Sequence, residues 1–591
     1  MNSRSCPDTA SQWINPKARS NQPLAAFIRF LAIACVITPA LAQELPPLPP
    51  ARLIEEGLRR ETQRLQEQAS EPVRDALRPA EAEAVPNEIP QETPCFDVQR
   101  IQLQGSMAKE FDWLYSRVKP WMNHCLGVKG LGQLTSALDA ALLEAGFVTS
   151  KVTLPPQNMA DGSLQINLHA GRIGVVESTP GLLWAGAFPV AAGDLLNVRD
   201  LDQGVEQMNR LPSRTVQTQL EPGTEPDTSI VRIQSKPTGS RLRGGVTLDN
   251  SGSPALGRPQ LSTHLAFDDP TGLNDLISAS INTNLKDLAA DHRSQSLALN
   301  YSIPWGYNLF TLSANTTRFA QQIQLTTAAV VSSGRSQGLD LRWDHTIWRN
   351  QSSKMGVFAG ASIRRSNSFL GDVELVVQKR RNSFANLGVH YKHLFRRASL
   401  DVELSLRKGL GWFGAEPDFD SVVSQGLTLR PQIWNASIAL DVPDLFNRRA
   451  RTQPGQIVRA IGLRSSVRLQ HTKDTTLTID QFSIGSRGSV RGFDGASSLL
   501  AENGVVWRNE LMMPMQIGSL PALGYLAVDI GRVWGPSSGQ LIGKRLAGAA
   551  LGVRSQWRQL QFDAALAMPL SKPSGFRSAR LSPYLSLSYV F

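Results

Sequence analysis

The segment with the clearest chemical potential runs from Ser483 to Gly495 and reads Ser-Ile-Gly-Ser-Arg-Gly-Ser-Val-Arg-Gly-Phe-Asp-Gly. Its glycines allow backbone conformations that other residues rarely adopt, which predicts a tight loop with Arg491 at its tip. A guanidinium is a planar fork of N–H donors that matches a carboxylate in a bidentate ion pair. Recognition of an acidic group is therefore the chemistry that this segment predicts.

The loop lies within a long C-terminal region, residues 239–591, in which apolar and polar residues alternate. For example, the last strand places Leu585, Leu587, Tyr589 and Phe591 on one face. Strands of this period suit a barrel that faces lipid on one side and a wet lumen on the other. At roughly 20–24 residues per strand and connection, the region predicts a transmembrane β-barrel of about sixteen antiparallel strands, wide enough to conduct. No segment of the mature chain has about 18 uninterrupted apolar residues, so no transmembrane helix is expected.

Two small α+β units precede the predicted barrel, at residues 95–170 and 171–238. In each unit a strand is followed by helices and two further strands; in the first, strands are expected over 98–104, 147–154 and 164–168. Such a repeated unit before a barrel is the organisation of periplasmic POTRA domains, which bind extended client chains at a sheet edge. Plain spacer domains are the alternative interpretation.

The N-terminal segments are predicted to be exported and then tethered. Residues 1–42 have a basic start, a short apolar run over 30–37 and a small-residue cleavage site, which indicates a signal peptide rather than a membrane anchor. Residues 43–69 comprise a proline-rich start and a helix that is polar on all sides, which suits a plug in a water-filled pore or a solvated tether. Residues 70–94 predict a semi-extended linker that reaches on the order of 75 Å.

Four cysteines are present, and Cys6 and Cys35 leave with the signal peptide. The remaining Cys95 and Cys125 form an even pair in an oxidising compartment, which predicts one disulfide. A disulfide that closes a loop of this size would stabilise a small domain by about 3–4 kcal/mol. Two cysteines without clustered histidines make a poor ligand set, so no metal site is predicted, nor any other cofactor.

Two functional classes are disfavoured by the sequence. The chain has 61 Lys and Arg against 50 Asp and Glu residues, a net charge of +11, but the basic residues form no run of five or more, so nucleic-acid binding is not predicted. An enzyme is not predicted either. Neither a Gly-x-Ser-x-Gly nucleophile elbow nor a His-Glu-x-x-His helix is expected, and Gly543-Lys544 lacks the other residues of a phosphate-binding loop.

A set of short motifs occurs in order along the mature chain. They are Cys95-Phe96, Cys125-Leu126-Gly127, Leu154-Pro155-Pro156-Gln157, Gly171-Arg172-Ile173, Leu248-Asp249-Asn250-Ser251-Gly252, Gln481-Phe482-Ser483-Ile484-Gly485, Val490-Arg491-Gly492-Phe493 and Arg508-Asn509-Glu510-Leu511. With these motifs the chain resembles the two-partner secretion transporters. These are outer-membrane barrels of the barrel-assembly translocase superfamily that export haemolysins and filamentous haemagglutinins.

The resemblance implies that the loop at about 485–500 folds into the lumen, with Val490, Arg491, Gly492 and Phe493 at its tip. The motif that it meets on the barrel wall maps to Ala527-Val528-Asp529-Ile530-Gly531. Alternation turns Asp529 and Gly531 inward, where Asp529 is predicted to pair with Arg491. Two residues depart from the pattern: Ala527 stands where the family often has Phe or Gly, and strict alternation turns Arg532 toward lipid, where a long side chain can snorkel. Tyr589 and Phe591 resemble a barrel-assembly recognition signal.

The resemblance further implies an outer-membrane pore with periplasmic POTRA domains. The domains would capture a secreted haemolysin- or adhesin-like partner, and the pore would export it unfolded without nucleotide hydrolysis. Outer-membrane lipids and the barrel-assembly machinery are the other expected partners, and the barrel is expected to be monomeric. A barrel-assembly insertase of the same superfamily is the alternative; a passive porin and a chemical activator of the partner are weaker ones.

Overall fold

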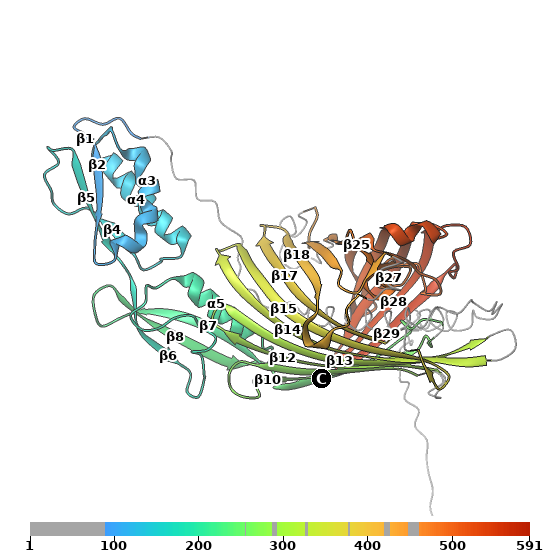
Figure 1. Ribbon diagram of the computed structural model, residues 1–591. Helices are drawn as coiled ribbons and strands as arrows, with labels where there is room; N and C mark the ends of the chain where they lie inside the picture. Colours follow the sequence, from blue (N-terminus) through green and yellow to red (C-terminus); the bar gives the residue numbers. More distant parts are fainter. Residues whose placement is uncertain are drawn as a thin grey trace, which may run out of the picture.

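The computed structural model describes residues 89–254, 256–285, 292–324, 329–375, 379–418, 426–446 and 460–591. The predicted signal peptide, the predicted helix over 52–69 and most of the predicted linker lie outside the described residues. The described chain comprises two small domains followed by a closed barrel (Figure 1). None of its helices is long and apolar enough to cross a membrane.

The first domain packs helix α4 against a three-stranded sheet of order β2-β5-β4. Gly146, with φ of +99°, ends α4, and the carboxylate of Glu92 accepts hydrogen bonds from the N–H groups of Lys129 and Gly130 at its start. Ile89 packs on the same core, so Ile89 and Glu92 of the predicted linker contact this domain. The elements are β1 (Phe96–Val98), β2 (Arg100–Gln104), η1 (Ala108–Leu114), α3 (Tyr115–Val118), η2 (Lys119–Trp121), β3 (His124–Leu126), α4 (Val128–Ala145), β4 (Lys151–Thr153) and β5 (Ser163–His169).

Two local features of this domain bear on the sequence predictions. Cys95 and Cys125 are joined as a disulfide, beside the paired strands β1 and β3. The strand expected over 147–154 is shorter, because Ser150 donates to the carbonyl of Phe147 in a turn and only β4 is extended. The ring of Phe147 packs edge-on against Phe111 at 4.9 Å, which holds this turn on the core.

The second domain repeats the plan with helix α5 over a sheet of order β6-β8-β7. Asn197 caps α5, because its side-chain oxygen accepts from the N–H of Arg199 at 2.8 Å. Strands β7 and β8 form a hairpin, and β7 lies at one edge of the sheet. The elements are β6 (Arg172–Ser178), α5 (Val198–Asn209), β7 (Arg214–Pro222) and β8 (Thr228–Pro237).

Sixteen long antiparallel strands form the barrel in the described residues, and β9 pairs with β29 to close it. The sixteen are β9 (Leu242–Asp249), β10 (Gln260–Asp268), β11 (Leu276–Asn284), β12 (Arg293–Trp305), β13 (Asn308–Gln324), β14 (Ala329–Arg349), β15 (Ser353–Leu370), β17 (Arg380–Leu394), β18 (Ser399–Leu410), β20 (Gln432–Val442), β21 (Gly462–His471), β25 (Asn503–Ile517), β26 (Leu520–Trp534), β27 (Arg545–Trp557), β28 (Leu560–Ser571) and β29 (Ser582–Val590). The fold class expected from the alternation is thus confirmed for the barrel and the two domains. Short pieces complete the described elements: β16 (Val373–Glu374), η4 (Trp412–Gly414), β19 (Leu427–Thr428), β22 (Thr475–Thr476), η6 (Thr478–Asp480), β23 (Phe482–Ile484), β24 (Leu499–Ala501) and η7 (Pro536–Gln540).

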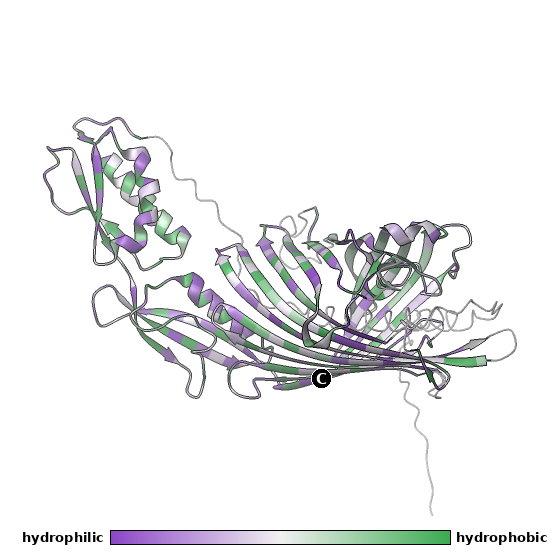
Figure 2. Cartoon of the chain, viewed as in Figure 1, coloured by the Kyte–Doolittle hydropathy of each residue, from purple (hydrophilic) through white to green (hydrophobic). Residues whose placement is uncertain are grey.

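The alternation of each strand sets its two faces. On β26 the outward Leu526, Val528 and Ile530 are exposed, while Ala527 and Asp529 are buried on the inner face. Hydrophobic residues accordingly recur along the strands at every second position (Figure 2). Arg532 follows this parity and is exposed on the outer face, with its guanidinium 5.9 Å from the Trp534 ring.

Helix α5 docks the second domain onto one end of the barrel strands. Gln203 and Gln207 donate to the carbonyl of Gly306, in the turn between β12 and β13. Buried Glu206 forms ion pairs with Arg349, at 3.2 Å, and with Lys354. Polar contacts from one face of α5 therefore help to hold the domain on the barrel.

Glu206 is expected to make this joint sensitive to acid. Burial raises the pKa of its carboxyl, whereas the positive charges of Lys354 and Arg349 lower it. The effect of the two charges is larger, so the pKa of Glu206 lies below its ordinary value of 4.5. A carboxyl with a lowered pKa contributes stability above its unfolded value, and that stability is lost as the pH falls through the folded value. Glu206→Gln should loosen the joint at neutral pH and remove this acid dependence.

Hydrogen exchange of the 305–308 turn, measured from pH 7 downward, tests this expectation. Removing the carboxylate leaves two cations beside each other, a change that costs on the order of 3–5 kcal/mol for a buried pair. Glu221→Gln is the matched control, because Glu221 pairs with Arg232 on the surface of the same domain. Equal exchange in both variants would contradict the role given to Glu206.

Candidate loop and wall site in the barrel lumen

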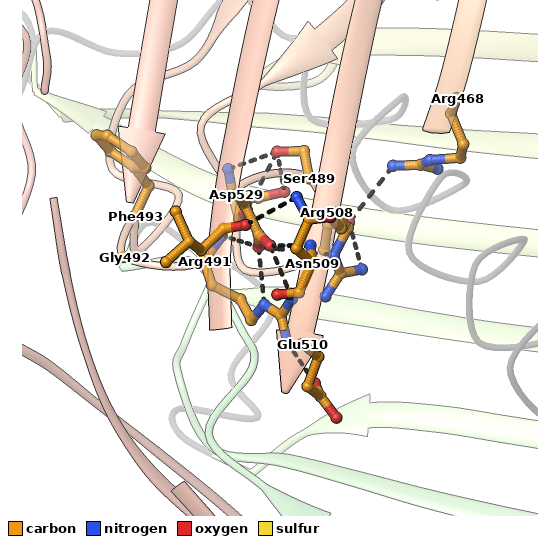
Figure 3. A network of polar contacts seen from close by, with 12 residues as sticks. Arg468, Ser489, Arg491, Gly492, Phe493, Arg508, Asn509, Glu510 and Asp529 are labelled. Carbon is orange, nitrogen blue, oxygen red and sulfur yellow. Dashed lines mark hydrogen bonds and ion pairs between the residues drawn. The ribbon is translucent and has the colours of Figure 1, made fainter. Parts of the chain in front are cut away.

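The glycine-rich segment folds as a loop between the short strands β23 and β24, inside the barrel and against the inner faces of β25 to β27 (Figure 3). Ser489 shapes it, because its hydroxyl accepts from the N–H groups of Gly485 at 3.0 Å and Ser486 at 3.1 Å. Arg468 and Arg508 on the wall donate to the carbonyl of Gly488. The loop is therefore a folded element with a defined place on the wall.

Arg491 is the centre of the site. Its Nε and Nη2 each donate to one carboxylate oxygen of Asp529 at 2.7 Å, which is the bidentate geometry. The backbone N–H of Arg491 donates to the same carboxylate at 2.9 Å. Nη1 donates to Glu510 at 2.5 Å and Nη2 to the carbonyl of Asn509 at 3.1 Å. Both Arg491 and Asp529 are buried. Loss of either side chain would therefore leave the charge of the other buried without its partner.

The pair belongs to a longer chain of alternating charges on the inner wall. Glu510 also accepts from Arg554, whose Nε donates to Asp563 at 3.2 Å. Five charges of alternating sign thus run from β26 through the loop to β25, β27 and β28: Asp529, Arg491, Glu510, Arg554 and Asp563. Each charge has an opposite neighbour, which offsets the cost of removing it from water.

Small residues let the loop approach the wall. Gly492 has φ of +106°, and a Cβ there would lie 2.3 Å from the carbonyl oxygen of Met568. On the wall, a Cβ on Gly548 would lie 1.9 Å from the carbonyl oxygen of Arg491, and one on Gly531 would lie 2.9 Å from Val490. Gly531 and Gly548 therefore provide the space in which the loop tip sits.

The tip is also tied to the last strand. The hydroxyl of Tyr584 on β29 accepts from the N–H of Gly492 at 2.9 Å and donates to the carbonyl of Phe493 at 3.2 Å. The Phe493 ring is fully buried and packs edge-on against Phe576 at 5.6 Å. Asp494 pairs with Arg258, between β9 and β10, at 3.0 Å.

The remaining predicted residues lie elsewhere. The terminal Phe591 exchanges two backbone hydrogen bonds with Gly244 of β9, both at 2.9 Å, and its ring lies 6.1 Å from that of Tyr589. In the described part of the chain, no cluster of three or more His, Cys, Asp or Glu side chains is arranged to hold a metal ion.

The Gly-x-Ser-x-Gly string is present in the sequence, although no nucleophile elbow is predicted. The string occurs twice, at 334–338 and 535–539. The first copy lies inside strand β14 and the second in the turn that contains η7 after β26. Neither forms the strand-to-helix elbow that exposes a nucleophile, because neither leads into an α-helix.

A family model described as haemolysin secretion/activation protein ShlB/FhaC/HecB matches residues 227–555. The chain belongs to this family. Models of a ShlB-type POTRA domain and of a POTRA domain match residues 96–171 and 173–222. This member of the haemolysin secretion/activation family is an outer-membrane transporter with two POTRA domains, and not an enzyme.

Named relatives agree with this assignment. The outer membrane transporter CdiB-2 of Burkholderia pseudomallei is 33% identical over 528 residues, covering 85% of this chain and 88% of the relative. The hemolysin transporter protein ShlB of Serratia marcescens is 25% identical over 458 residues, covering 76% and 78%. The solved structure of CdiB from Escherichia coli is similar at a TM-score of 0.79 and 26% identity, covering 93% of this chain and 100% of that one.

The structure brings together Val490, Arg491, Gly492 and Phe493 of the transporter with Asp529 and Gly531, as the motif positions suggested. Sequence reasoning missed three contributors to the same site: Glu510, Arg554 and Tyr584. Glu510 lies in the quoted Arg-Asn-Glu-Leu motif, so its motif position was a usable signal. Arg554 and Tyr584 stand at inward positions of strands whose contacts only the closed barrel defines.

Proposed function

We propose that this transporter captures an extended secreted partner with its periplasmic POTRA domains and passes it, unfolded, through the barrel to the cell surface. The observation that carries the proposal is a loop that fills part of the lumen and is held there by ion pairs and hydrogen bonds rather than by covalent links. Such contacts can be exchanged for others without large rearrangement of the wall. Haemolysin- and adhesin-like proteins are the proposed cargo class.

The free edge of the second POTRA domain supports the capture step. On the outer side of β7, the Asn209 side chain bonds both the N–H and the carbonyl of Val216. Alternation along a strand turns the backbone groups of Thr218 and Leu220 to the same side. In the described residues no hydrogen bond occupies that part of the edge, so an extended client can add to it as a further strand.

Thr218→Pro tests this edge directly. Proline removes one N–H and places its ring where an added strand would lie, yet it breaks no bond to β8, because that N–H points away. Binding of the partner's N-terminal domain to the purified transporter should fall on the order of tenfold, and its export should fall with it.

Thr218→Ala is the matched control, because it keeps the N–H and should leave binding unchanged. If Thr218→Pro binds the partner as well as Thr218→Ala does, the client does not use this edge. If neither variant nor the wild type binds any partner encoded beside the transporter, capture by this domain is itself wrong.

The resting pore and the driving force complete the proposal. The polar helix predicted over 52–69 would share the lumen with the loop, and both would shift for transport. The sequence predicts no nucleotide-binding loop, so nucleotide hydrolysis would not drive export. Folding of the cargo outside the cell would drive export instead and make it irreversible. Assembly of the barrel itself would depend on the barrel-assembly machinery through Tyr589 and Phe591.

A further inference from the structure

A row of basic side chains lies on the outward face of the barrel at the end away from the POTRA domains. It contains one residue from each of six neighbouring strands, β12 to β15, β17 and β18. We define this rim row as Arg293, Arg318, Arg335, Arg365, Arg381 and Lys408. With about 4.8 Å between neighbouring strands, the row extends roughly 24 Å around the barrel.

The outward orientation follows from the strand period. Arg318 stands six residues after the exposed Leu312 on β13, and Arg335 stands six before the exposed Leu341 on β14. An even spacing keeps these side chains on the same face of the strand. Arg365 is itself exposed, and Arg381 stands six residues before the exposed Leu387 on β17. The rim row therefore faces the membrane side, and not the lumen.

The height of the row places it at the membrane boundary. Arg335 lies eight residues along β14 from Trp343, which is exposed on the same face toward the POTRA end. Eight residues span about 27 Å along the strand, or about 20 Å along the membrane normal at a tilt of about 40°. This is close to the height of the apolar band, so with the exposed Trp343 at the inner interface the arginines lie at the outer one.

Like charges face each other within the row. Arg318 is directly opposite Arg335, and Arg365 is directly opposite Arg381, in the strand registers. Such pairs are destabilising unless an anion lies between them. In the described residues no carboxylate forms an ion pair with any of these four arginines, and the Nε of Arg381 is buried without a hydrogen-bond partner. Glu374, beyond β15, pairs with Lys379 at 3.5 Å instead.

We propose that the rim row binds the phosphate groups of a phosphorylated glycolipid of the outer leaflet, of the lipid A type. Guanidinium groups match phosphate oxygens in bidentate pairs, and two opposed arginine pairs on adjacent strands provide two such positions. The acyl chains would lie along the apolar face below. Peripheral lipid binding of this kind is independent of the loop and of the partner.

Lipid A carrying both phosphates, offered to the purified transporter in mixed detergent micelles, is the probe. Native mass spectrometry counts the bound lipid and gives an apparent Kd. We expect the wild type to bind the lipid. A triple variant should bind it on the order of 100-fold more weakly; this variant combines Arg318→Gln, Arg335→Gln and Arg365→Gln. Millimolar inorganic phosphate should not displace the lipid, and phosphatidylglycerol should bind less tightly.

Adjacent residues provide the matched control. Arg364→Gln and Arg365→Gln remove the same charge from neighbouring positions of β15, but Arg364 has the inward parity. Only Arg365→Gln should weaken binding, by roughly fivefold. Heat-modifiable migration verifies the folded barrel, and the single variants decide the question if the triple variant fails to fold. Equal binding by the two single variants, or complete displacement by inorganic phosphate, would overturn the proposal.

Discussion

Replacing Arg491 with alanine is expected to reduce export of the partner at least tenfold while the barrel stays inserted. The change leaves the fully buried Asp529 without its bidentate partner. Loss of one member of a buried pair costs on the order of 3–5 kcal/mol. The lower part of that range applies here, because Arg508 lies 3.7 Å from Asp529 and Arg554 still pairs with Glu510. The loop should therefore leave its place on the wall without unfolding the barrel.

Export into the culture medium and heat-modifiable migration of the barrel measure the two parts of this expectation. Arg487→Ala is the matched control, since Arg487 lies in the same loop but stacks on the Tyr584 ring, at 4.6 Å, an interaction of about 1 kcal/mol. Normal export by Arg491→Ala would refute the function given to the loop.

Gly548→Ala is expected to displace the same loop without removing any charge. The added Cβ would lie 1.9 Å from the carbonyl oxygen of Arg491, so the wall or the tip must move by about 1 Å or more. A shift of that size takes the hydrogen bonds between Arg491 and Asp529, now 2.7 Å long, out of range. Export should fall as in Arg491→Ala, and the single-channel conductance at rest should rise.

Gly539→Ala provides the control, because a Cβ at Gly539 meets nothing within 4 Å. Planar-bilayer recordings of the two variants compare the resting pores directly. A Gly548→Ala pore with the conductance and export of the wild type would show that the tip tolerates a different position. The close approach of loop and wall would then have no functional role.

Local periodicity was enough to predict the architecture of this protein. A strand has a period of two, so alternation along β26 already divided Leu526, Val528 and Ile530 from Ala527 and Asp529. The helix that ends at Gly146 was predictable for the same reason, because helical spacing and a C-terminal glycine are features of adjacent residues. The pairing of Arg491 with Asp529 came from motif resemblance rather than from periodicity.

Contacts between distant strands were decided only by the tertiary structure. Alternation states which face a residue occupies but not its height or its neighbour across the lumen, so Arg554 and Tyr584 could not be assigned to the loop. The register of β13 with β14 determines that Arg318 opposes Arg335, and a slip of two residues would keep both outward while separating them. The sequence by itself therefore determined which side chains face water or lipid. Closure of the barrel, which fixes register and brings the loop back onto the wall, decided which charges meet.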